Sequence, residues 1–67
     1  MKCYKVEKYE AFKVSGKTHY SAVANYGTMC EEDMLLTVKG YKANKMEDGT
    51  IIYTRSNSKY SYIVEEA

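Results

Sequence analysis

Two turn-forming segments in the C-terminal half constrain the fold of this chain more than any other feature. Asp48-Gly49 lies between two runs of alternating apolar and polar residues, and this dipeptide is among the strongest short-range signals for a β-hairpin. A second turn-rich segment, residues 56–59, reads Ser-Asn-Ser-Lys. Together the two turns predict a three-stranded antiparallel meander with strands over residues 41–46, 50–55 and 60–65.

A third turn predicts another hairpin near the N-terminus. Ser15-Gly16 separates two β-favouring runs, so we expect strands over residues 3–14 and 18–24. In the first of these strands, apolar residues fall on even positions at Val6 and Phe12 but on an odd position at Tyr9. This change of phase predicts a bulge or a bend near residues 7–8.

A helix is predicted between the hairpin and the meander. Residues 28–31, Thr-Met-Cys-Glu, match a capping box, in which the Thr hydroxyl and the Glu side chain bond to backbone donors at a helix N-terminus. Apolar residues follow at helical spacing, and Gly40 is a suitable C-terminal stop. The sequence therefore predicts a helix over residues 29–39 and an α+β fold of order β-β-α-β-β-β. We expect one domain over residues 1–67, with the helix packed on a small antiparallel sheet.

The faces of the meander follow from its turns. Two-residue loops would place Lys42 opposite Arg55 and Tyr53 opposite Tyr62, and paired residues share a face of the sheet. The more apolar face, which we expect the helix to cover, then carries Met46, Ile51, Tyr53, Tyr62 and Val64. The opposite face is a candidate contact patch or dimer seam and exposes Tyr41, Ile52 and Ile63. A register slip of one residue would exchange the two faces.

The same register predicts a basic cluster at the end of the sheet nearest residues 56–59. Lys42 opposite Arg55 is a like-charge pair, which is mildly destabilising and would be relieved by an anionic partner. A solvated sheet end is the alternative interpretation. The predicted partner-binding residues are Tyr41, Lys42, Arg55, Lys59 and Tyr60, with Ile52 and Ile63 adding apolar area.

No motif in the chain indicates catalysis or cofactor binding. His19 is expected on a hairpin strand, and with Cys3 and Cys30 it cannot supply the four ligands of a structural zinc site. We therefore expect no enzyme activity, no metal and no cofactor. Because no apolar run suits a signal peptide or a membrane span, we expect a cytoplasmic protein with no membrane contact. In that compartment Cys3 and Cys30 are expected to be free thiols, with a disulfide between them as the alternative.

The composition favours a binding role. The chain has eight tyrosines, which offer contact area at low entropic cost, while a net charge of +1 makes no general case for nucleic acid. In length and composition the chain resembles the small accessory proteins carried by bacteriophages and other mobile elements, although no specific motif carries the resemblance. That resemblance implies binding to a host protein. We therefore expect a protein-binding modulator or inhibitor. The alternatives are a small nucleic-acid-binding protein that uses the basic and aromatic cluster, and a homo-oligomeric structural protein.

Overall fold

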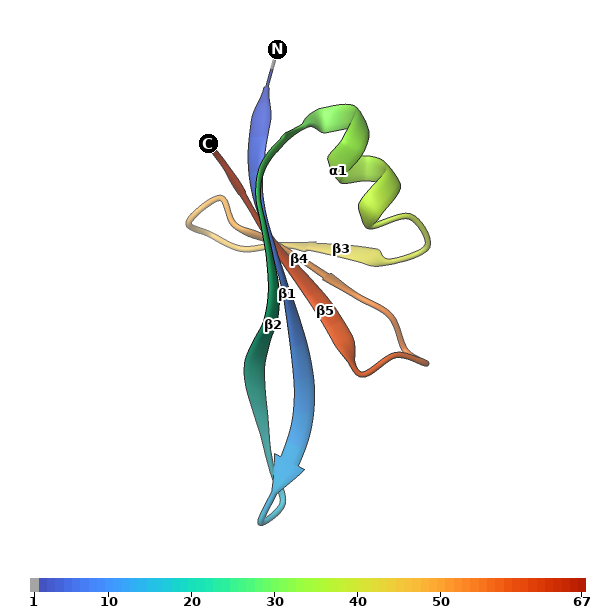
Figure 1. The fold of residues 1–67 in the computed structure, drawn as a ribbon. Helices are drawn as coiled ribbons and strands as arrows, with labels where there is room; N and C mark the ends of the chain where they lie inside the picture. Colours follow the sequence, from blue (N-terminus) through green and yellow to red (C-terminus); the bar gives the residue numbers. More distant parts are fainter. Residues whose placement is uncertain (1) are drawn as a thin grey trace.

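The computed structural model describes residues 2–67 as a five-stranded antiparallel sheet with one short helix (Figure 1). The elements are β1 (Cys3–Val14), β2 (Lys17–Cys30), α1 (Glu31–Thr37), β3 (Lys42–Lys45), β4 (Ile51–Thr54) and β5 (Tyr60–Glu66). Across the sheet the strand order is β2-β1-β5-β4-β3. The predicted antiparallel sheet with one helix is confirmed, and pairing of β1 with β5 joins the hairpin and the meander into a single sheet.

The N-terminal hairpin forms at the predicted turn. Ser15 and Gly16 have φ values of 52° and 78°, the left-handed conformation that a two-residue type I′ turn requires at both positions. β2 is longer than expected: it continues beyond residue 24 to Cys30, because the first half of β1 supplies pairing partners for these residues.

The hairpin is irregular at the predicted position, but the prediction assigned the bulge to the wrong strand. The register shifts between Val6 and Glu7 and again between Lys8 and Tyr9. In both places the extra residue belongs to β2, so β1 remains regular while β2 carries two bulges. The unbroken part of the pairing therefore runs from the turn to residue 22 of β2.

The helix is shorter than predicted, and its N-terminal capping box does not form. α1 begins at Glu31 and ends at Thr37, and its N-cap position makes no side-chain capping bond. Thr28 lies within β2 and pairs with β1, so strand pairing takes the residues that the capping box would need. Gly40 has a φ of 87° and stands after the helix, as expected for a stop.

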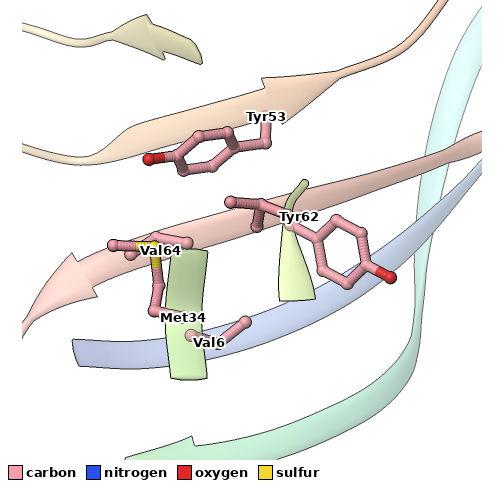
Figure 2. Close-up of a cluster of buried hydrophobic side chains, with 6 residues drawn as sticks. Val6, Met34, Tyr53, Tyr62 and Val64 are labelled. Atoms are coloured by element: carbon pink, nitrogen blue, oxygen red, sulfur yellow. The ribbon is translucent and has the colours of Figure 1, made fainter. Parts of the chain in front are cut away.

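The core lies between α1 and one face of the sheet, where side chains from four elements meet (Figure 2). Its buried residues are Val6, Met34, Val38, Tyr53, Tyr62 and Val64. The face predicted to be covered by the helix is thus confirmed, and Ile51 packs against it. The expectation for Met46 was wrong: this side chain is 39 % exposed and lies outside the core.

The turn at Asp48-Gly49 explains the error. The Met46 N–H donates to the Thr50 carbonyl at 2.7 Å, so the loop has three residues instead of two. Gly49 takes a φ of 92°, and the Thr50 N–H donates to Asp48 Oδ1 at 2.9 Å, which holds the pKa of this carboxyl below its ordinary value. This loop is a common three-residue hairpin with glycine in the left-handed position.

The extra loop residue shifts β3 by one position against β4. Lys42 pairs with Thr54 and Ala43 with Tyr53, whereas β4 and β5 keep the predicted register, with Tyr53 opposite Tyr62. A one-residue shift moves each side chain of β3 to the other face of the sheet.

The β1–β2 hairpin extends well beyond the rest of the sheet (Figure 1). Pairing of β1 with β5 ends at Glu10, and just beyond it the Ala11 N–H donates to the carbonyl of Lys59, the residue before β5, at 2.7 Å. From there to the turn, residues 12–19 form a two-stranded projection, here called the arm. It contributes to a longest molecular dimension of 43 Å, about twice the other two.

Candidate protein-binding surface

The basic cluster predicted from the sequence does not assemble. Lys42 lies opposite Thr54 on the uncovered face, while Tyr60 belongs to the helix-covered face, and Arg55 follows β4 in a loop. The reason is the three-residue loop, which shifts Lys42 by one position. Lys42 and Arg55 nevertheless border one shallow hollow of about 400 Å³ at this end of the sheet.

Tyr41 packs against the core and does not lie on the uncovered face, where the sequence predicts it to be. β3 begins one residue later, and the Tyr41 N–H donates to the Val38 carbonyl at 3.0 Å, which keeps Tyr41 beside the helix. Its ring meets the Tyr62 ring edge-on at 5.1 Å between centroids, and its hydroxyl lies 3.4 Å from Ser58 Oγ. The side chain is half-buried, so only part of it can meet a partner.

Lys59 and Tyr60 lie together, but their charge environment differs from the prediction. Lys59 Nζ is 3.1 Å from Glu10 Oε1, and this bond raises the pKa of the lysine. The ring of Tyr60 has the Lys8 ammonium 4.2 Å from its centroid and the Lys59 ammonium at 5.4 Å. An acid from β1 therefore neutralises one cation of the predicted cluster, which weakens its attraction for an anionic partner.

Two tyrosines of the meander have a structural role. Tyr53 and Tyr62 are buried, and burial raises the pKa of both phenols because it disfavours the charged form. Tyr9 also has a raised pKa, chiefly because its hydroxyl donates to Glu7 Oε2 at 3.0 Å.

The uncovered face of the sheet carries an apolar hollow. Ile52 pairs with Ile63 on this face, as predicted, and both are half-buried. Tyr9 and Tyr20 extend the apolar surface from this pair toward β2. The hollow has a volume of about 250 Å³ and is lined by Tyr9, Tyr20, Ile52, Thr54, Ser61 and Ile63.

Sequence reasoning missed the exposed apolar residues of the hairpin. Most of the large hydrophobic side chains exposed in residues 2–67 lie on β1 and β2, among them Tyr20 at 63 % exposed. They lie on both faces of the hairpin, because Phe12 shares the side of β1 that carries Val6, whereas Tyr20 lies on the uncovered face. Clustered exposed apolar side chains indicate an interaction surface. On these two strands they are Phe12, Val14, Tyr20, Val23 and Tyr26.

The backbone of β2 adds unpaired hydrogen-bonding groups to this surface. The Cys3 carbonyl accepts from the Ala67 N–H, and the Ala11 N–H donates to the Lys59 carbonyl, each one residue beyond an end of β5. Odd-numbered residues of β1 therefore face β5, and even-numbered residues face β2. In the regular part of the hairpin, the β2 partners of the even residues are those at positions 17, 19 and 21. The backbone groups that point outward from the sheet edge are therefore those of Thr18, Tyr20 and Ala22.

The two edges of the sheet differ in charge. β3, at one edge, has four residues and includes Lys42 and Lys45. β2, at the other edge, has fourteen residues, and from position 18 to position 30 it contains no Lys, Arg, Asp, Glu or Pro. Natural proteins protect edge strands with short length, charges, proline or bulges. β3 has two of these protections, whereas residues 18–22 of β2 have none. This lack of charge was visible in the sequence.

Residues 2–67 contain no group of three or more His, Cys, Asp or Glu side chains placed to hold a metal ion. The only helix in that range, α1, is too short to cross a membrane. Cys3 and Cys30 are free thiols and lie directly opposite each other on β1 and β2. No family model matches the chain, and neither the curated proteins nor the solved structures include one that matches it.

Proposed function

We propose that this chain is a non-enzymatic protein-binding modulator that contacts its partner through the β2 edge, defined as residues 17–23 of β2. The observation that carries the proposal is a strand edge whose only formal charge is on Lys17, with free backbone groups and exposed apolar side chains. An extended segment of a partner protein can add to such an edge, with main-chain hydrogen bonds giving affinity and side-chain contacts giving specificity.

The arm and the adjacent face favour this mode of binding. An isolated two-stranded hairpin is only marginally stable in water, so a third strand added beside β2 would stabilise the arm. Tyr20 links the edge to the apolar hollow that contains Ile52 and Ile63. The side chains of a partner strand at the edge would thus also contact residues on the uncovered face.

Two matched double variants test this proposal. Tyr20→Glu/Val23→Glu changes the β2 edge, and Leu35→Glu/Leu36→Glu makes the same kind of change at two exposed positions of the helix. Each variant and the wild type are immobilised and used to capture proteins from an extract of the native host cell, with detection by mass spectrometry. We expect a specific partner that the edge variant loses and the helix variant keeps.

Either of two results would count against the proposal: an unchanged partner set for the edge variant, or no specific partner for any form, a second copy of this chain included. Nucleic-acid binding has less support, because Lys59 is paired with Glu10 and the β2 edge carries a single positive charge, on Lys17. An electrophoretic shift at low salt that weakens steeply with added salt would favour that alternative.

A further inference from the structure

We infer that the partner of the β2 edge is a second copy of this chain, paired antiparallel about a two-fold axis at Tyr20. This inference rests on the proposed binding role of the edge and names its occupant. The two sheets would join into one continuous sheet, with β2 of each copy at the centre.

The backbone pattern selects this register. Outward groups lie at positions 18, 20 and 22, and a bulge follows at Val23, so the regular edge is centred on Tyr20. Two such edges related by a two-fold axis place Tyr20 opposite its own copy and Thr18 opposite Ala22, which gives hydrogen-bonded pairs at all three positions. A register centred further along β2 would meet the bulges and lose this regularity.

The charges are compatible with self-pairing. An interface about a two-fold axis places the same segment of both copies side by side. A charged strand would therefore repel its own copy unless positive charges faced negative ones. In the register centred on Tyr20, the only formal charge is on Lys17, which lies opposite the uncharged Val23. No like charges face each other across the shared strands.

The surface area also indicates a missing partner. The chain has an accessible surface of 4989 Å², whereas a compact monomer of 7.7 kDa is expected to expose about 4300 Å². The excess of about 650 Å² approaches the roughly 800 Å² that each partner buries in an ordinary specific interface. A second copy on the β2 edge would cover part of the region that produces this excess.

The assembly would close at two copies. Pairing of the two β2 edges leaves only the β3 edges at the ends of the joined sheet, and these are short and carry Lys42 and Lys45. Lysines on a short edge strand oppose further edge-to-edge association. The geometry therefore favours a closed dimer over a fibre.

A charge-swap experiment tests the axis at Tyr20. Tyr20→Lys and Tyr20→Glu each place like charges opposite each other at the centre of a homodimer, and the side chain is exposed enough for both variants to fold. We expect each variant to dimerise about tenfold more weakly than the wild type, because it loses an aromatic pair and gains a repulsive one. An equimolar mixture should form a heterodimer about tenfold tighter than either variant alone.

Sedimentation velocity from low micromolar to millimolar concentration measures these affinities, and circular dichroism checks the fold of each variant. Leu36→Lys mixed with Leu36→Glu is the control, because this exposed position lies on the helix. A monomeric wild type at every concentration, or a Tyr20 mixture that associates no better than its components, would overturn the inference. Capture of a different protein that depends on Tyr20 and Val23 would still support the proposed function.

Discussion

Replacement of Val64 by alanine tests the position of the core. Val64 is fully buried on β5, the central strand, where it lies opposite Val6 and Ile51. The lost methyl groups correspond to about 1.6 kcal/mol of transfer free energy, and the cavity raises the expected loss to about 2–3 kcal/mol. A domain of this size has a free energy of unfolding of about 3–10 kcal/mol, so the variant should lose a large fraction of its stability.

Val14→Ala is the matched control, because the same chemical change occurs at a strand residue that is 50 % exposed at the tip of the arm. We expect this control to lower the free energy of unfolding by about 0.5 kcal/mol. Urea denaturation of both variants at one fixed protein concentration, followed by circular dichroism, gives the two differences. Equal losses for the two variants would refute the division into a buried sheet centre and a weakly packed arm.

Three further predictions follow from the turn, the buried tyrosines and the paired cysteines. Ser15→Asn should raise the free energy of unfolding by about 0.5 kcal/mol in urea denaturation, because asparagine adopts the left-handed conformation more readily; a loss of stability would contradict the type I′ turn. Burial raises the pKa of Tyr53 and Tyr62 above the ordinary 10.0, so folding stability should be complete below pH 10 and decline as the pH rises through the folded-state values. Tyrosinate absorbance should then show a late-titrating class that shrinks in Tyr62→Phe, and a single titration at the ordinary value would disprove this assignment. Cys3 faces β5 through its carbonyl, so it forms a non-hydrogen-bonded pair with Cys30 at about 4.5 Å between Cα atoms, within disulfide range. Oxidation of the purified protein with a small disulfide reagent should close this bond and add about 3.5 kcal/mol of stability in urea denaturation, whereas two thiols that still titrate would contradict the register.

Local signals predicted much of the fold. The bounds of β1, the turn at Ser15-Gly16 and the register of β4 against β5 agree with the sequence, because each depends on residues close together in the chain. The helix-covered face followed from the same short-range register, and Tyr53 and Tyr62 lie on it as expected.

Competing interactions account for the errors. Thr28 has good capping chemistry, but in the structure it pairs with Lys5 of β1 and does not cap the helix. The pairing that prevents capping joins residues far apart in the chain. Asp48-Gly49 suits both two-residue and three-residue loops, and the choice between them decided where Lys42 points. The predicted site was therefore sensitive to a single residue of register.

The β2 edge could have been found from the sequence only in part. The absence of charge from position 18 to position 30 is plain in the residue order, but its meaning depends on β2 being an edge strand. That placement follows from the pairing of β1 with β5, which joins residues fifty or more positions apart. Local patterns do not encode such a contact.

Amide hydrogen exchange, followed residue by residue by NMR, tests the pairing of the β2 edge most directly. The N–H groups of His19 and Ser21 face β1 and serve as the internal reference, whereas those of Thr18, Tyr20 and Ala22 point outward from the sheet. Pairing with a second copy predicts that the three outward amides exchange slowly at high protein concentration and faster on dilution. Rapid exchange of these three amides at every concentration, with His19 and Ser21 still protected, would contradict it.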